Sequence, residues 1–274
     1  KVEGVNNSKI SGVGVRVARD YHVVYGYTNS KEEAALVKLA TDLAQSFQGE
    51  SRGIKVELGE LEADQNHTVK ILPSEVSIDE KIEILKRANK AARAYSDEIT
   101  QVNARYLDYV QDVWVANSEG KYVKDQRVRT RLAISSIASD DSMKQMGFNG
   151  PGGFYGFEIF TDLIDVEAAA AEASRIAVQN LHAEDCPSGK MPVIIDNGFG
   201  GVIFHEAVGH SLEATSVARG ASVFCGKKGE QIASELVTAV DDGTIPNAWG
   251  SATYDDEGNK QKRRVLIKNG KLNS

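Results

Sequence analysis

The sequence has little of several features that mark common protein classes. Its 274 residues include only two cysteines and five prolines. Cys186 and Cys225 form no CxxC pair, which excludes a disulfide framework and suits a reducing compartment. No apolar run reaches the roughly 18 residues that a membrane-spanning helix needs, and the N-terminal residues show no signal-like apolar region. These absences predict a cytoplasmic protein that does not associate with membranes.

Positive charge is also scarce. Lysine and arginine number 32 against 39 aspartates and glutamates, which gives a formal net charge of −7 and a pI near 5.4. Non-specific binding to nucleic acid or to an anionic membrane needs a basic surface instead. The one basic cluster, residues 260–264, adjoins the acidic residues 255–257 and is typical of a solvated turn. We therefore expect no nucleic-acid partner.

The N-terminal part of the chain has patterns of both strands and helices. Apolar residues alternate with others over 13–17 and again over 23–27, which predicts an antiparallel pair of strands. Ser30 with Glu33, and later Ser77 with Glu80, have the spacing of a capping box, so a helix is expected after each serine.

In the middle of the chain, apolar residues recur at every second position. Apolar alternation over 102–109, 113–116 and 128–137 predicts an antiparallel meander with a turn at 117–120. A stretch with five glycines, the first Gly147 and the last Gly156, then predicts a long flexible loop. That loop is either a lid or partner contact, or a plain connection. A further helix is predicted over about 165–181.

Helices and strands come in blocks rather than in strict βαβ alternation, which predicts an α+β fold with a largely antiparallel sheet. The break at residues 185–189 (DCPSG) marks the expected domain boundary. We expect an N-terminal α+β domain over 1–187, with sub-parts of about 1–76 and 77–187. Residues 188–274 are expected to begin a β-rich catalytic domain that is truncated at Ser274.

The most informative stretch is 192–213, PVIIDNGFGGVIFHEAVGHSLE. An apolar run, a glycine-rich turn and a second apolar segment predict a strand, a turn and a helix. The last segment carries His205, Glu206 and His210. Two imidazoles beside a carboxylate can bind a divalent metal next to a general base, as in the HExxH helices of zinc peptidases. The spacing here is one residue longer, HExxxH.

The longer spacing has a geometric consequence. Five residues rotate an ideal helix by about 500°, which leaves the two histidines roughly 140° apart. An i to i+5 turn would bring them back to one face, and Gly209 is a position where the helix can loosen. We therefore predict a helical irregularity between His205 and His210. Taken alone, a single histidine is more often a structural group than a ligand.

Several further segments carry a family resemblance. GFGGVIFHEAVGHSLEA, RGASVF, GEQIASELVTAVDDGT and DDEG together resemble the TldD branch of the TldD/PmbA family of zinc-dependent peptidases, once described as modulators of DNA gyrase. The resemblance is dense from about 196 to 270 and diffuse before 181. It implies hydrolysis of unfolded or extended peptides by a catalytic subunit that pairs with a sister subunit or forms a homo-oligomer.

The resemblance also implies roles for the motif residues. His205 and His210 would bind zinc, and Glu206 would take a proton from the attacking water. In the family a cysteine far downstream supplies the third ligand, which is therefore expected beyond Ser274. We expect zinc to be absent or weakly bound in the 274-residue chain and the chain itself to be inactive. Cys225 and Cys186 are alternative ligands.

Three acidic residues and one predicted strand could assist such a site. Glu213, Asp241 and Asp242 could orient a metal ligand by accepting its N–H, although a surface glutamate and an Asp-Asp-Gly turn explain them equally. The predicted strand at 222–224 could pair with an extended substrate.

Two other functions are compatible with parts of the sequence. The chain could be a non-catalytic peptide-binding or assembly subunit of a hetero-oligomeric protease, with structural histidines. The turn with Gly198, Gly200 and Gly201 could be a dinucleotide site, but it lacks the third glycine of GxGxxG.

Overall fold

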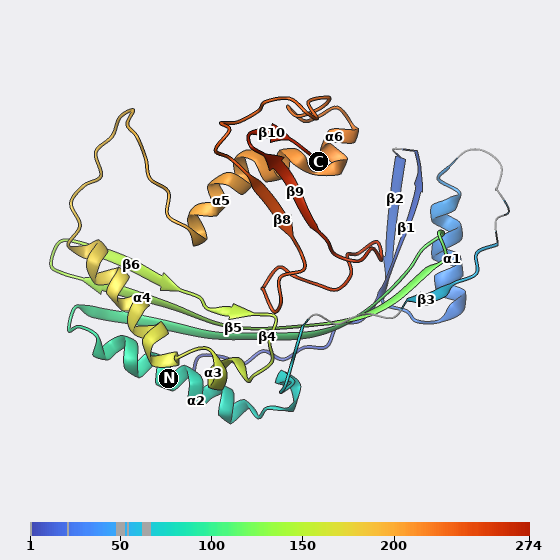
Figure 1. Cartoon of the computed structure of the whole chain (residues 1–274). Coiled ribbons are helices and arrows are strands. Elements are labelled where there is room, and N and C mark those ends of the chain that lie inside the picture. The colour runs from blue at the N-terminus through green and yellow to red at the C-terminus, as the bar shows by residue number, and fades with distance from the viewer. Residues whose placement is uncertain (1, 21, 48–52, 54, 62–66) are drawn as a thin grey trace. The chain divides into compact units, whose positions relative to one another are not determined.

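The computed structural model of the chain describes residues 2–20, 22–47, 53, 55–61 and 67–274 (Figure 1). Contacts divide the chain into two units that alternate along the sequence. The first comprises Lys1–Lys55, Met191–Val237 and Asn269–Asn273, and the second Val56–Lys190, Thr238–Lys268 and Ser274. The mixture of helices with mainly antiparallel sheets confirms the predicted α+β class. The predicted domain boundary after residue 187 stays a prediction.

Within the described ranges, none of the helices is both long enough and apolar enough to cross a bilayer.

The first unit begins with the predicted hairpin. Strands β1 (Val13–Arg19) and β2 (His22–Thr28) pair antiparallel over their whole length, and helix α1 (Glu33–Ala44) packs beside them. The space above Gly26 is filled by the side chains of Leu39 and Leu43 from α1. The predicted helix therefore faces the hairpin with these two leucines.

The capping box predicted at the start of α1 does not form. The helix begins at Glu33, and its N-cap residue Glu32 makes no side-chain cap. Instead, Ser30 donates its N–H to Thr28 Oγ1 at 3.1 Å, and its own hydroxyl oxygen accepts the Glu32 N–H at 3.2 Å. These local turns use Ser30 before the helix starts, which is why the prediction was wrong.

The second capping box is confirmed. Ser77 caps α2 (Ile78–Ala94), and its hydroxyl accepts the Glu80 N–H at 3.3 Å while the Glu80 carboxylate accepts the Ser77 N–H at 3.1 Å. A cap of this kind contributes about 1 kcal/mol to stability. A single 3₁₀ turn, Pro73–Glu75, precedes it.

The second unit is built around one long central strand. Strand β5 (Lys121–Ser139) pairs antiparallel with β4 (Ile99–Ala116) through the predicted turn after residue 116. The two predicted runs in β4 are one strand, because Gln111 and Asp112 between them stay in register. Three shorter strands also pair with β5, namely β3 (Gly59–Leu61), β6 (Lys144–Asn149) and β7 (Gly152–Gly153).

The glycine-rich stretch is therefore not the long flexible loop that was predicted, because β6 and β7 pair with β5 within it. Gly147 lies against the backbone of helix α4 (Val166–Leu181), and a Cβ there would come within 2.0 Å of the Ala173 carbonyl oxygen. At Gly156 a Cβ would come within 1.9 Å of the Ile71 carbonyl oxygen. These glycines permit close backbone contact.

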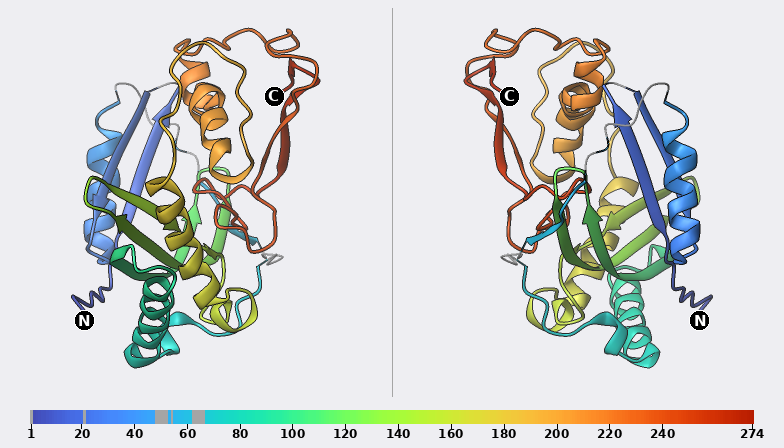
Figure 2. Two further views of the ribbon diagram at one scale, coloured as in Figure 1. Left: turned by 90° about the vertical axis from the view of Figure 1, so that its left-hand side faces the viewer. Right: turned by 90° about the vertical axis from the view of Figure 1, so that its right-hand side faces the viewer.

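Helices α2 and α4 cover one face of this sheet (Figures 1 and 2). Small side chains let the helices approach each other, and larger ones from β5 and from the short helix α3 (Ile159–Asp162) fill the remaining space. The core residues include Ala88, Ala92, Leu132, Ile134, Ile159, Phe160, Ala170 and Ala173. As predicted, α4 starts after Asp165, whose carboxylate accepts the Ala168 N–H at 2.9 Å.

The last part of the second unit holds β8 (Ala239–Asp242) and β9 (Arg263–Lys268), which pair antiparallel. The next strand in the chain, β10 (Lys271–Leu272), belongs to the first unit. The segment between β8 and β9 contacts the central sheet. Asn247 donates its side-chain N–H groups to the carbonyls of Thr68 and Phe154, and Arg129 of β5 donates to the Ser251 carbonyl at 2.9 Å.

Two short strands predicted from apolar runs are absent. Residues 193–195 have no regular structure, and Ile194 is 99% exposed. Residues 222–224 form a turn. The Ser222 hydroxyl accepts the Phe224 N–H, and the Ser222 carbonyl accepts the Cys225 N–H. The predicted strand at 222–224 is therefore wrong, and pairing of an extended substrate with it loses its structural basis. Short apolar runs do not fix a strand without a neighbouring strand to pair with.

Replacing Gly147 by alanine should destabilise the fold. The new methyl group would force β6 away from α4, because the Ala173 carbonyl oxygen and the Ala177 nitrogen, at 2.0 and 2.4 Å, are backbone atoms that cannot rotate aside. We expect the free energy of unfolding in urea to fall by about 1–3 kcal/mol or more. Gly250→Ala is the matched control, because nothing lies within 4 Å of its Cβ position. Equal unfolding midpoints for the two variants would contradict this packing.

Candidate metal centre

The HExxxH motif lies in one irregular helical stretch of the first unit. A 3₁₀ turn, Gly198–Gly200, leads into helix α5 (Gly201–Phe204). A wide π turn, His205–Gly209, and a second 3₁₀ turn, His210–Leu212, follow before helix α6 (Ala214–Ala218).

The predicted irregularity between the two histidines is confirmed. The backbone N–H of His210 donates to the carbonyl of His205, an i to i+5 bond in place of the usual i to i+4 bond. The wide turn takes up the one extra residue of HExxxH. It therefore places both imidazoles on the same side of the helix.

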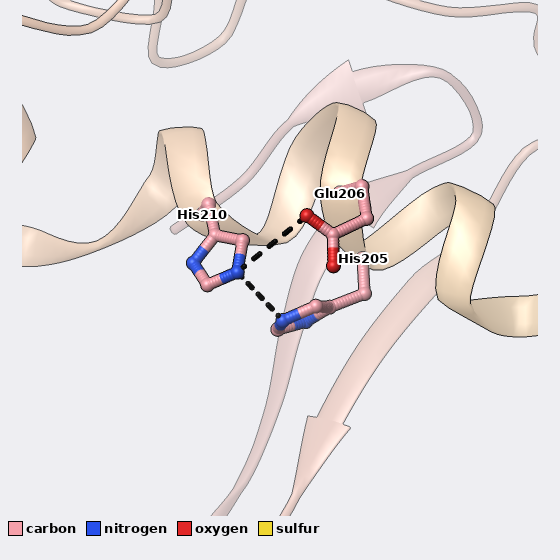
Figure 3. A group of neighbouring side chains, drawn as sticks. All are labelled: His205, Glu206 and His210. Carbon is pink, nitrogen blue, oxygen red and sulfur yellow. Dashed lines mark hydrogen bonds and ion pairs between the residues drawn. The ribbon is translucent and has the colours of Figure 1, made fainter.

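The polar atoms of the motif converge (Figure 3). His205 Nε2 and His210 Nε2 are 3.1 Å apart, and the two rings meet at an interplanar angle of 62°. Glu206 Oε2 lies 3.8 Å from His210 Nε2. One potential ligand atom from each of the three residues lies within 4.8 Å of the others. Among the described residues, this is the group of histidine, cysteine and acidic side chains that could hold a metal ion.

Glu213 fixes the orientation of one of the two rings. Its Oε1 lies 2.6 Å from His210 Nδ1. This hydrogen bond raises the pKa of His210 above its ordinary value, and the nearby charge of Glu206 acts in the same direction. In the neutral ring, a proton on Nδ1 that is donated to Glu213 leaves the Nε2 lone pair directed at His205. Metal-bound histidines have this kind of partner.

The spacing of the nitrogens fits zinc. Zinc binds imidazole nitrogen at about 2.0–2.1 Å with tetrahedral angles, which places two such nitrogens about 3.3 Å apart. The observed separation of 3.1 Å is close to this value. The side chains are also accessible to an ion from solvent, since those of Glu206 and His210 are 65% and 54% exposed.

The remaining candidate residues have other partners. Asp242 accepts from the backbone N–H and hydroxyl of Thr244 at 2.9 and 2.6 Å, which lowers its pKa, and Asp241 pairs with Arg264 in the β8–β9 ladder. Both belong to the second unit, and their role as orienting groups stays a prediction. Cys225 donates its thiol to the Val217 carbonyl at 3.3 Å, and Cys186 is exposed.

The dinucleotide alternative loses its structural basis. Such a turn follows a strand, whereas residues 192–196 form none. Gly198 has a φ of +76° and starts a 3₁₀ turn. An open, mainly apolar hollow lies here instead, lined by residues that include Ile195, Gly201, Ile203 and Ala207.

Relatives of the chain are metalloproteases by name. It is 40% identical over 198 residues to a metalloprotease TldD homolog of Haemophilus influenzae, an alignment that covers 71% of this chain and 41% of that protein. It is 34% identical over 276 residues to a metalloprotease of Methanothermobacter thermautotrophicus, which covers 100% of this chain and 59% of that protein. The chain thus spans about half the length of these relatives.

The fold also has a solved counterpart. The crystal structure of a putative modulator of a DNA gyrase from Thermotoga maritima matches with a TM-score of 0.77 and 23% identity, over 96% of this chain and 59% of that one.

Three segments match the successive domains of one family. Residues 1–46 match domain 1 of the PmbA/TldA metallopeptidases, 71–181 their central domain and 188–274 their C-terminal domain. The chain therefore belongs to the PmbA/TldD metallopeptidase family, as the segments around HExxxH predicted.

Proposed function

We propose that this chain carries the metal-binding motif of a zinc-dependent peptidase that hydrolyses peptide bonds in unfolded or extended peptides. The observation that carries the proposal is the convergence of two imidazole nitrogens, 3.1 Å apart, beside a carboxylate on one wide helical turn. The names of the relatives support a metalloprotease. Zinc is proposed because its tetrahedral coordination by nitrogen donors suits this spacing.

Each motif residue has a distinct chemical task in this proposal. His205 and His210 would hold the ion through Nε2. A bound zinc ion supplies Lewis acidity, which polarises a peptide carbonyl and lowers the pKa of a water molecule to about 7. Glu206 then accepts the proton of the attacking water and delivers it to the leaving amine. Its carboxylate lies on the same side as the imidazoles, which supports this role (Figure 3).

The motif supplies fewer ligands than a complete zinc site has. Two histidines bind zinc more weakly than a site with a third ligand. We propose that a third ligand from outside the motif completes the site. A sister subunit of the family or a second copy is the proposed partner, and the cytoplasm the proposed location. The two free cysteines agree with a reducing compartment.

Replacing Glu206 by glutamine tests the assigned general base. In the full-length protein, we expect peptide hydrolysis to fall by about 100-fold or more, because a neutral amide cannot accept the proton of water. Zinc content, measured by elemental analysis, should stay unchanged. Glu235→Gln, at an exposed position of the same unit, is the control and should retain activity.

Two outcomes would contradict this assignment. Loss of zinc from the Glu206 variant would make that residue a ligand instead. Unchanged hydrolysis would favour the alternative of a non-catalytic peptide-binding or assembly subunit.

Replacing Glu213 by glutamine tests the orientation of His210. We expect zinc affinity to fall by about 10- to 100-fold, because the ring loses the carboxylate that holds Nδ1. Without metal, the pKa of His210 should also move down, since the bond to Glu213 raises it. Chelator competition measures the affinity, and NMR titration of the imidazole measures the pKa. An unchanged pKa would show that the bond does not form in solution.

A further inference from the structure

Gly209 occupies an unusual position in the motif. Its φ of −56° and ψ of −54° are ordinary helical values, which any residue adopts. The conformation of the backbone therefore does not require glycine here. In a helix, alanine is favoured over glycine, so glycine at this point weakens the helix. Some other property of the position must account for the missing side chain.

That property is the place of the His205 ring. A Cβ on residue 209 would lie 2.8 Å from His205 Nδ1, 3.4 Å from its Cγ and 3.5 Å from its Cε1. The first distance is shorter than real Cβ contacts allow, so the ring would have to move. The imidazole of His205 therefore rests with its Nδ1 side against the Gly209 backbone, in the space that a methyl group would fill.

The other end of the same ring is the metal-binding end. His205 Nε2 lies 3.1 Å from His210 Nε2. The imidazole is rigid, so a rotation that takes Nδ1 away from residue 209 also carries Nε2 away from its present position. The two histidines are thus held by different means. A carboxylate holds His210, whereas the packing of the ring on Gly209 holds His205.

We propose that Gly209 is a positioning residue for the metal centre, whose missing side chain lets His205 direct Nε2 toward His210. This inference rests on the proposed function, in which the two imidazoles hold the ion. It adds a requirement to HExxxH, because the residue before the second histidine must be glycine for the first histidine to reach the metal. The wide turn and the glycine act together: the turn aligns the two residues, and the glycine makes room for one ring.

The test replaces Gly209 by alanine in the full-length protein. Gly201→Ala is the matched control, because Gly201 lies at the start of the same helical stretch with nothing within 4 Å of its Cβ position. Zinc affinity is measured by chelator competition, and stability by urea unfolding of the metal-free protein. We expect Gly209→Ala to lower zinc affinity about tenfold or more, as the loss of a ligand-orienting contact does. Its unfolding midpoint should be unchanged or higher, because alanine favours the helix.

The outcomes separate this inference from the proposed function. Full zinc affinity in Gly209→Ala would overturn the inference while leaving the function intact. A lower unfolding midpoint for Gly209→Ala than for wild type would assign the glycine to helix packing and would also overturn it. If His205→Ala and His210→Ala bind zinc as tightly as wild type does, both the role of Gly209 and the proposed function are wrong.

Discussion

One backbone hydrogen bond determines what the motif can do. The His210 N–H donates to the His205 carbonyl, five residues back instead of four. On a regular α-helix the same two side chains would be roughly 140° apart, and no single ion could contact both. With the wide turn, their Nε2 atoms lie 3.1 Å apart. π turns are rare and occur often at functional sites, which agrees with a site built on this irregularity.

The surroundings of this turn explain how it keeps both rings in place. Glu213 bonds to the far nitrogen of His210, and Gly209 leaves room for the ring of His205. Both residues follow the first histidine by eight residues or fewer, so the local chain supplies all of these constraints. The motif can therefore adopt its geometry without distant contacts, although a complete zinc site takes at least one more ligand.

The sequence predicted those parts of the structure that local rules decide. The rotation per residue of an ideal helix predicted the wide turn before His210. The spacing of Ser77 and Glu80 predicted the capping box. Prediction failed where distant contacts or a competing local turn decide. The glycine-rich stretch that begins at Gly147 has a composition typical of a loop. In the structure it pairs with β5 and lies against α4. Ser30 matches a capping box, but a competing turn uses its hydroxyl. The steric role of Gly209 could not be predicted, because the motif alone does not show where the imidazole lies.

The most direct test of the central claim is X-ray absorption spectroscopy at the zinc edge of the full-length protein. This method counts imidazole ligands and measures their distances. Two histidine nitrogens at about 2.0–2.1 Å are expected, and the count should fall to one in both His205→Ala and His210→Ala. A zinc shell with one imidazole or none in the wild type would contradict the account, because the two rings would then not share an ion.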